Sequence, residues 1–440
     1  MSSRATRQDS QVHTRRRIVD AGAAVFAGHG FGGATVTRIA EEAGFTIGAV
    51  YSNFAGKEDL FLAVVDEHLE TNLDGATRAL QEAPTLEEAA RDLGSGAMTF
   101  LEANPDRFLL FVEAWAFALR DAGFRPRFTR RQADSHRVLT EALAGRLARE
   151  GLATDDLPVA HAALALKGLF HGIAFERATN PGSVSPDALA SAATLILRSL
   201  SAAAPGTRRR RGGTAQRPRR ASEPQSPALP ASRGRFTRHE SQEITRGRIV
   251  EAAASIFARR GYRAATVAQI AEEAGFTVGA VYSNFAGKED LFLAVADERL
   301  GEQLEDVARV LAAAPTLEDV AHALGTFGRD YLRANPDWFP LFVEAWAFAR
   351  RDATFGSRFA QRQANSHHVL AEALAVRLAQ ECVVLDAPPV TDIALAFKAV
   401  YNGIAIEQAT NPGSVPDDAL PTICALLLGG LTRVAGGPGR

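Results

Sequence analysis

Residues 39–64 read IAEEAGFTIGAVYSNFAGKEDLFLAV, and residues 270–295 read IAEEAGFTVGAVYSNFAGKEDLFLAV. The two stretches lie 231 positions apart and differ at one of their 26 positions, where Ile47 is matched by Val278. The same offset aligns LFVEAWAFA at 110–118 with 341–349, and ATNPGSV at 178–184 with 409–415. Because solenoid units are only roughly 20–50 residues long, this offset indicates tandem duplication of a whole domain.

Within each copy, the quoted stretch predicts a helix, a tight turn and a second short helix. Thr35 is placed to cap the first helix, and Gly44 stands where that helix can end in a left-handed conformation. Thr46 can cap the second helix, on which Val50 and Phe54 fall four apart and should face the core. Two short helices joined by a glycine-containing turn form a helix-turn-helix, whose second helix fits the DNA major groove. The inward stripe of the first helix is Val36, Ile39, Ala40 and Ala43.

This segment closely resembles the DNA-binding domain of the TetR family of bacterial transcriptional regulators. The resemblance rests on the tyrosine, the phenylalanine three residues later, the following lysine and the apolar run after it. It covers about 50 residues in each copy, and the remaining ~140 residues fit by length and helical content. The resemblance implies an all-α chain of two TetR-like units, each with a helical ligand-binding and dimerisation domain after the helix-turn-helix.

The expected organisation has five segments. Helical spacing of apolar residues, without sustained period-2 runs, supports helices throughout both copies. The segments are a helix-turn-helix domain at 12–62, a helical effector and dimerisation domain at 63–200, a disordered Arg- and Pro-rich linker at 201–240, a second helix-turn-helix domain at 241–293, and a second helical domain at 294–440. By position, the family's dimerisation helices would be about 158–178 and 186–200, then 389–409 and 417–430.

The resemblance also assigns the DNA contacts. Gly48 and Ala49 are small enough for close approach to the groove floor, and the apolar Ile47 favours thymine methyls and DNA shape over hydrogen-bonded readout. Tyr51 matches a family position that usually binds phosphate, although a surface packing role is the alternative. The predicted DNA-binding residues are Thr37, Thr46, Ile47, Gly48, Ala49, Tyr51, Asn53 and Lys57 in the first copy, and Thr277, Val278, Gly279, Ala280, Tyr282, Asn284 and Lys288 in the second. Thr37 is matched by Ala268, which has no hydroxyl.

Two arginine clusters have open roles. Arg15, Arg16 and Arg17 could lie on a solvated helix surface or contact phosphate. The run Arg208 to Arg211 belongs to the linker, which is either a solvated tether or a source of salt-dependent DNA affinity. That linker carries ten Arg against Glu223 and Glu240, a charge of +8. The net charge of the 440-residue chain is −2, so its near-neutrality hides a basic segment.

The helical domains offer candidates for an effector pocket. Glu113, Trp115 and Phe117 recur as Glu344, Trp346 and Phe348, and His136 recurs as His367. A glutamate and a histidine beside aromatic rings could line a ligand pocket, and a satisfied core glutamate with a stacking tryptophan is the alternative. Several presumed interior positions differ between copies, including His171 against Asn402, so the two pockets need not bind one ligand equally.

Other site types find little support. Gly28-His29-Gly30-Phe31-Gly32-Gly33 satisfies GxGxxG, but it follows a helix rather than a strand, and the second copy keeps one of its three glycines. No spacing suggests a metal site, a cofactor or a nucleophile with its base, so we expect no enzyme. Two cysteines, the missing signal peptide and the lack of an apolar run of about 20 residues predict a cytoplasmic protein without a membrane partner.

These observations predict a DNA-binding transcriptional regulator, a repressor that responds to a small-molecule effector. Both recognition segments lie in one chain and are nearly identical, so we expect an intrachain pseudo-dimer that binds a near-palindromic stretch of double-stranded DNA. The alternative is an architectural DNA-binding protein without an effector, held on DNA mainly by the basic linker.

Overall fold

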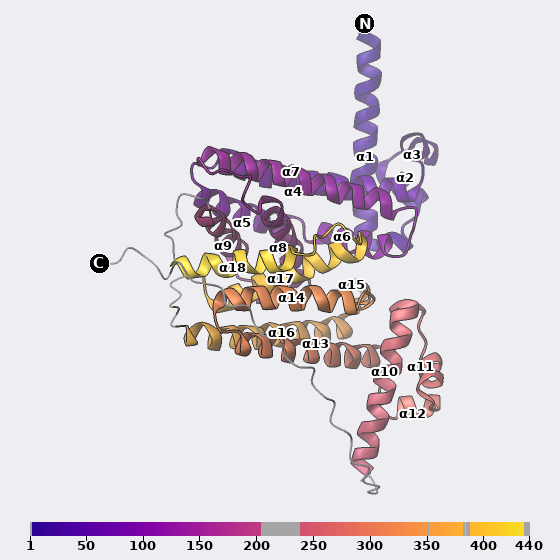
Figure 1. Cartoon of the computed structure of the whole chain (residues 1–440). Coiled ribbons are helices and arrows are strands. Elements are labelled where there is room, and N and C mark those ends of the chain that lie inside the picture. Colours follow the sequence, from indigo (N-terminus) through magenta and orange to yellow (C-terminus); the bar gives the residue numbers. More distant parts are fainter. Residues whose placement is uncertain (1, 204–237, 350–351, 382, 384–387, 435–440) are drawn as a thin grey trace, which may run out of the picture. The chain divides into compact units, whose positions relative to one another are not determined.

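The computed structural model describes residues 2–203, 238–349, 352–381, 383 and 388–434, and within these ranges it contains helices but no strand. The predicted all-α fold is therefore confirmed (Figure 1). The first half contains α1 (Ser2–Gly33), α2 (Val36–Ala43), α3 (Ile47–Asn53), α4 (Lys57–Glu82), α5 (Leu86–Ala103), α6 (Pro105–Ala118), α7 (Arg125–Arg149), α8 (Val159–Thr179), the short 3₁₀ turn η1 (Pro181–Ser183) and α9 (Ala188–Ala203).

The second half repeats this order of helices. It contains α10 (Arg238–Ala264), α11 (Val267–Ala274), α12 (Val278–Tyr282), α13 (Lys288–Ala313), α14 (Leu317–Ala334), α15 (Trp338–Ala349), α16 (Ala353–Gln380), α17 (Val390–Thr410) and α18 (Ala419–Val434). The helices expected for dimerisation in the family correspond to α8, α9, α17 and α18, whose bounds fall within a few residues of those expected.

The chain forms two compact units. The first unit combines Met1–Ala202 with Asp297–Arg440, and the second is Ala203–Ala296. The first unit therefore contains the first helix-turn-helix and the helical domains of both halves. The second unit contains the second helix-turn-helix.

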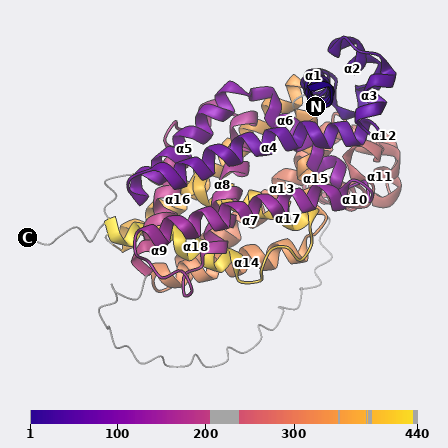
Figure 2. The same ribbon diagram turned by 90° about the horizontal axis from the view of Figure 1, so that it is seen from above.

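The helical domain of the first half is built on long neighbouring helices. α4 packs against α5 and α7, and α7 packs against α8, an arrangement that can be followed in Figure 2. The apolar face of α7 is buried, because Leu139, Leu143 and Leu147 are each at most 6% exposed. Burial of a leucine side chain contributes roughly 1.5–3 kcal/mol, so this face makes a large contribution to the stability of the domain.

Within the first unit, α8 of the first half packs closely against α17 of the second half. Small residues allow the two backbones to approach. A Cβ atom added to Gly172 would lie 2.1 Å from the backbone oxygen of Ala399, and one added to Gly403 would lie 2.2 Å from the backbone oxygen of Gly168. Larger residues at Gly172 or Gly403 would force these helices apart.

Two buried ion pairs cross the same contact. Lys167 Nζ lies 2.8 Å from Glu407 Oε2, and Lys398 Nζ lies 2.8 Å from Glu176 Oε2. The four residues are two pairs of equivalent positions, so each half gives one lysine and receives one carboxylate. Each lysine also donates to a backbone oxygen of its own half, at Gln132 or Gln363. These extra bonds satisfy charges whose burial would otherwise be costly.

The two ends of this helix contact differ in chemistry. At one end His161 Nε2 lies 3.2 Å from Asp418 Oδ1. At the other end Asp392 occupies the position equivalent to His161, and it accepts a hydrogen bond of 2.8 Å from Ser185 Oγ. The seam between α8 and α17 is thus closely repeated at its centre and different at its ends.

Most of the predicted linker, 201–240, lies outside the described residues, which resume at Arg238 in α10. Arg208 to Arg211 and Cys382 likewise lie outside them. Within the described part of the chain, no helix is both long enough and apolar enough to cross a membrane.

Candidate nucleic-acid interface and ligand cavities

The first helix of the helix-turn-helix, α2, has the ends that the sequence predicted. The Thr35 side chain accepts a hydrogen bond from the Arg38 backbone N–H, which satisfies one free donor at the start of the helix. Gly44 ends the helix with φ 72°, a left-handed conformation that costs glycine little. Ile39, Ala40 and Ala43 are buried, as expected for the inward stripe.

The second helix, α3, presents one apolar face to the core and the rest to solvent. Thr46 caps it by accepting from the Ala49 backbone N–H. Val50 and Phe54 are each 2% exposed, which confirms their predicted core positions. Ile47 and Tyr51 are 43% and 57% exposed, which is high for large apolar or aromatic side chains. An exposed helix face of this kind is available for a partner surface.

The second helix-turn-helix repeats this geometry within its own unit. Thr266 and Thr277 cap α11 and α12, and Gly275 ends α11 with φ 72°. Val278 and Tyr282 are 41% and 55% exposed, close to the values of their counterparts. The remaining predicted contact positions are exposed or half-buried; they are Thr37, Thr46, Gly48, Ala49, Thr277, Gly279 and Ala280.

Asn53 and Lys57 have internal partners in the structure. Asn53 Nδ2 donates to the Ala49 backbone oxygen at 2.8 Å. Lys57 Nζ donates to the Phe31 and Ala34 oxygens at 2.9 and 3.2 Å and lies above the Phe31 ring. The second copy repeats these bonds with Asn284 on the Ala280 oxygen and with Lys288 on the Arg263 and Ala265 oxygens. These side chains are therefore held in place before any DNA is bound.

Two arginines of α1 secure the carboxyl ends of the two helices of the helix-turn-helix, α3 and α2. Arg15 Nη1 donates to the Asn53 oxygen at 2.9 Å, and its guanidinium lies 4.2 Å from the centre of the Phe54 ring. Arg17 Nη2 donates to the Ala43 oxygen, at the end of α2, at 2.9 Å. Cations at helix carboxyl ends satisfy free carbonyls and complement the helix dipole.

The role of these arginines was open from the sequence of one copy, but comparison of the two copies identifies it. Arg15 and Arg17 recur as Arg246 and Arg248, which donate to the Asn284 and Ala274 oxygens at 3.0 and 3.1 Å. Arg16, by contrast, is matched by Gly247. The repeated arginines are those that hold the two helices of each helix-turn-helix.

The run at Gly28–Gly33 lies in the last turns of α1, not between a strand and a helix. Gly30 has φ 66° there, and its counterpart Gly261 in α10 has φ 74°. The one glycine that both copies keep is therefore the one whose left-handed backbone bends the helix. This explains the run without a nucleotide.

The predicted pocket residues of the first half belong to a buried aromatic cluster and its edge. Trp115 is fully buried, with its ring 5.4 Å from Phe175 and 4.8 Å from His171. Glu113 accepts a hydrogen bond of 2.5 Å from the Phe31 backbone N–H and so joins α6 to the end of α1. Phe117 lies 4.4 Å from the Phe31 ring. Burial lowers the pKa of His136.

Their counterparts in the second half have related positions. Trp346 is 2% exposed and stacks on Phe175 of the first half, with ring centres 4.0 Å apart. Glu344 pairs with Arg120 at 3.4 Å. The Phe348 ring lies 5.0 Å from Phe355, and His367 Nε2 lies 2.9 Å from the Thr391 oxygen. None of these eight predicted residues lines the cavity found inside either helical domain.

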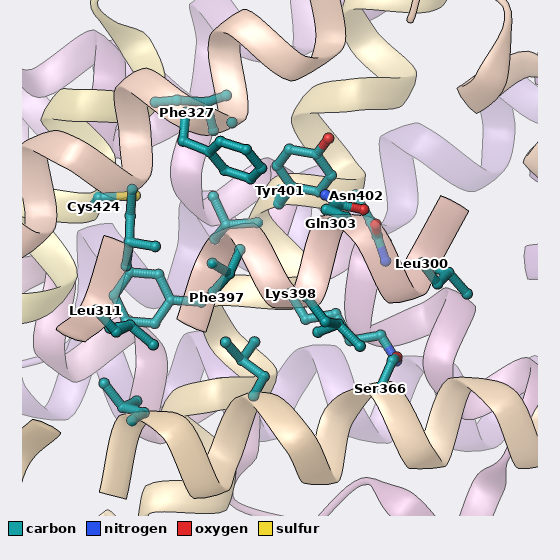
Figure 3. Close-up of a pocket in the computed structure, with 18 of the residues that line it drawn as sticks. Leu300, Gln303, Leu311, Phe327, Ser366, Phe397, Lys398, Tyr401, Asn402 and Cys424 are labelled. Atoms are coloured by element: carbon teal, nitrogen blue, oxygen red, sulfur yellow. The ribbon is translucent and has the colours of Figure 1, made fainter. Parts of the chain in front are cut away.

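Each helical domain nevertheless contains a cavity at the equivalent place. The cavity of the second half measures about 140 Å³ and lies among α13, α14, α15, α16, α17 and α18 (Figure 3). The cavity of the first half measures about 390 Å³ and lies among α4, α5, α7, α8 and α9. Several lining positions are identical in both halves, including Ser135 with Ser366 and Lys167 with Lys398.

The lysines that line the cavities were not predicted from the sequence, although the composition of the chain points to them. The chain has four lysines, and all four fall into equivalent pairs, Lys57 with Lys288 and Lys167 with Lys398. In a chain that otherwise uses arginine for its cations, this repetition indicates positions at which a compact ammonium is needed. Within the described residues, no group of three or more potential ligand side chains could hold a metal ion.

Comparison with known proteins agrees with this architecture. A profile described as "Bacterial regulatory proteins, tetR family" matches residues 18–64 and 249–295. A second profile, "BetI-type transcriptional repressor, C-terminal", matches residues 83–202 and 329–433. Both matches occur twice, as the duplication requires.

Individual relatives give the same result. The chain is 30% identical over 178 residues to the HTH-type transcriptional repressor AcnR of Corynebacterium efficiens, covering 39% of this chain and 85% of AcnR. It is 42% identical over 91 residues to the HTH-type transcriptional regulator TtgR of Pseudomonas putida, covering 21% of this chain and 40% of TtgR. A solved structure of the fatty acid degradation regulator FadR from Bacillus halodurans matches with 20% identity and a TM-score of 0.37, covering 42% of this chain and 96% of FadR. The chain belongs to the TetR family of bacterial transcriptional regulators and is a DNA-binding repressor that contains the family's two domains twice.

Proposed function

We propose that the protein is a ligand-responsive repressor in which the two halves act as an intrachain pseudo-dimer on a near-palindromic operator. The main support is the near identity of the two exposed recognition surfaces. They differ at Ile47 and Val278, which are 43% and 41% exposed, and both side chains are apolar. Two reading surfaces of the same chemistry favour two half-sites of nearly the same sequence.

The contact between α8 and α17 supports internal pairing. In this family the dimerisation helices normally come from two chains, whereas here one chain supplies them from both of its halves. Close approach at Gly172 and Gly403, together with two crossed ion pairs, is typical of a permanent contact between subunits. One chain could then present both recognition helices to one operator.

The DNA contacts divide into two classes. Ile47 with Gly48 and Ala49, and their counterparts Val278, Gly279 and Ala280, would face base edges and contact thymine methyl groups. Thr46 and Thr277 begin the recognition helices, within reach of base edges. The other predicted residues would bind phosphate and set the register; they are Thr37, Tyr51, Asn53, Lys57, Tyr282, Asn284 and Lys288. Lys57 and Lys288 can do so only with the ammonium hydrogen left by their backbone bonds.

The two cavities are the candidates for the effector sites. They are largely apolar spaces that contain a few polar groups, which is typical of small-molecule sites. The predicted pocket residues around the cavities, such as Trp115 and Trp346, would transmit the conformational change that the ligand causes rather than contact the ligand. Glu113 is the clearest case, because it joins the ligand-binding domain to α1 of the DNA-binding domain. An effector that binds the DNA-free conformation better would release the operator.

Footprinting on DNA upstream of the gene, combined with light scattering of the complex, tests this proposal. We expect protection of one discrete near-palindrome and a complex that contains one 46.9 kDa chain. Insertion of five base pairs between the half-sites should abolish binding, because it rotates them by about half a helical turn.

Two outcomes would overturn the proposal. A complex with two chains on one operator would contradict the intrachain pseudo-dimer. Coating of DNA in proportion to its length, without a preferred site, would instead support the architectural alternative. An operator with one of its two half-sites mutated provides the control, because it should bind the protein more weakly without changing the stoichiometry of the complex.

A further inference from the structure

The cavity of the second half has an unusual polar end. Gln363 lines it and is 1% exposed, yet its Nε2 atom has no hydrogen-bond partner. A buried donor without a partner costs about 1–3 kcal/mol, so a ligand that accepts from it would recover that energy. The backbone oxygen of Gln363 is already occupied, because it accepts from both Ser366 Oγ and Lys398 Nζ at 2.9 Å.

Lys398 lies at the same end of the cavity, because it bonds to the Gln363 backbone oxygen. Figure 3 shows Lys398 near Ser366. Its ammonium donates to the Gln363 backbone oxygen at 2.9 Å and pairs with Glu176 Oε2 at 2.8 Å. An ammonium has three hydrogens, so one remains for a ligand. Gln363 and Lys398 together offer two donors, which suits an oxygen acceptor such as a carboxylate.

The remainder of this cavity is small and mostly apolar, with Gln303, Tyr401 and Asn402 among its polar lining residues. Its walls include Phe327, Trp338 and Phe342. A volume of about 140 Å³ is close to that of an engineered cavity of about 150 Å³ that binds benzene in another protein. The space therefore suits a compact ring and is too small for a long chain or a fused ring system.

The equivalent cavity in the first half has diverged toward a larger ligand. Gly96 stands where the second half has Phe327, and a Cβ atom added to Gly96 would meet no atom within 4 Å. The missing phenyl group helps to explain why this cavity reaches about 390 Å³. Its lining is also more polar, since it includes Asp92, Thr99 and Asn104, whose counterparts in the second half do not line the smaller cavity. Burial lowers the pKa of His171 well below its usual value, so the imidazole is neutral there.

Building on the proposed ligand-responsive function, we infer that the chain has two different ligand sites. The site of the second half binds a benzene-sized apolar molecule whose oxygen acceptor faces Gln363 and Lys398. The site of the first half binds a bulkier molecule. The protein therefore combines two chemical signals in one chain, which a homodimer of identical subunits cannot do with one ligand site per subunit.

Benzoate tests the compact site in the full-length chain. Trp338 lines that cavity, so benzoate should change the tryptophan fluorescence, and calorimetry should give one site per chain. Gln363→Leu should weaken binding about tenfold by removing one hydrogen bond to a charged group. Gln132→Leu, the same change at the equivalent position of the first half, should leave the affinity unaltered. Equal weakening by both variants, or no benzoate binding at all, would overturn the inference.

The naphthalene dye 8-anilinonaphthalene-1-sulfonate tests the larger site. We expect one bound dye per chain, none in Gly96→Phe and two in Phe327→Ala, with the stoichiometry measured by calorimetry. Thermal melting monitored by circular dichroism identifies a variant that has not folded. If one of the two variants has not folded, the dye stoichiometry of the other decides whether the cavities differ. Two dyes bound to the wild-type chain would show that the cavities are equivalent.

These binding measurements need no DNA, so they fail separately from the proposed function. If benzoate and the dye occupy different sites but neither changes the footprint, the two-site inference stands and a regulatory effect of these probes is excluded. If both probes occupy the same set of sites, the inference fails even if operator binding responds to them.

Discussion

At the scale of single residues, the exposed tyrosines offer a direct test of the DNA contacts. Tyr51→Phe removes a hydroxyl from a side chain that is 57% exposed, so the fold should keep its stability. Loss of one phosphate hydrogen bond should weaken operator binding about fivefold, or roughly 1 kcal/mol. Fluorescence anisotropy measures the affinity. Tyr282→Phe should cost the same and the two effects should multiply; a large effect from one tyrosine alone would contradict symmetric docking.

Asp66 gives a pH-dependent prediction. It lies on α4 and pairs with Arg131 of α7 at 3.1 Å, while its Oδ1 atom has no hydrogen-bond partner. Burial raises the pKa of this carboxyl from 3.8 to about 6. The native state therefore binds more protons than the unfolded state between these values, so Asp66 lowers the stability as the pH rises from 4 to 6.

Asp66→Asn should remove this penalty. The variant should gain stability relative to the wild type as the pH rises, by on the order of 2 kcal/mol at pH 7, and most of the gain should vanish at pH 4. Urea denaturation at both pH values measures the difference. A gain of the same size at both values would show that protonation of Asp66 is not its cause.

At the scale of helices, the recognition segment could be predicted from the sequence because local rules govern it. Capping by Thr35 and Thr46 and the left-handed Gly44 depend on neighbours along the chain, and the structure confirms each. The hydrogen bonds of Arg15 and Arg17 to helix ends depend on residues 38 and 26 positions away, respectively. Such contacts leave no periodic pattern, so only comparison of the two copies could have revealed them.

The cavities were harder to predict for a related reason. Repetition drew attention to Trp115 and Trp346, but repetition marks shared structure, and both side chains are core residues next to Phe175. The positions that shape each cavity are partly those that do not repeat, such as Gly96 and Phe327. Volume depends on several helices at once, and no single-helix pattern encodes it.

The contact between α8 and α17 yields a prediction at the same scale. Gly172→Leu places a side chain where even a Cβ atom would lie 2.1 Å from the Ala399 oxygen, so the helices must separate. We expect a loss of at least about 3 kcal/mol in stability, measured by denaturation. Gly145→Ala is the control, because this exposed glycine of α7 has no atom within 4 Å and alanine favours helix by about 1 kcal/mol. Similar losses in both variants would mean that the close approach is not needed.

For the whole molecule, the crossed ion pairs should couple the two halves. Lys167→Met leaves Glu407 buried without its partner, which should cost about 3–5 kcal/mol. Adding Glu407→Met should recover much of that loss, since it removes the uncompensated charge. A double-mutant cycle measured by thermal unfolding gives the coupling. Additive losses would show that the two residues stabilise their own halves independently.

The ends of the α8–α17 seam have a consequence for how such a protein can evolve. In a homodimer every substitution enters the interface twice, so a histidine that suits one end must also be tolerated at the other. Fusion removes this constraint, and His161 meets Asp418 here while its equivalent, Asp392, meets Ser185. One gene thus carries two interface halves that can accept mutations one at a time. Selection, or a protein engineer, can make the partnership exclusive, so that neither half pairs as readily with a copy of itself.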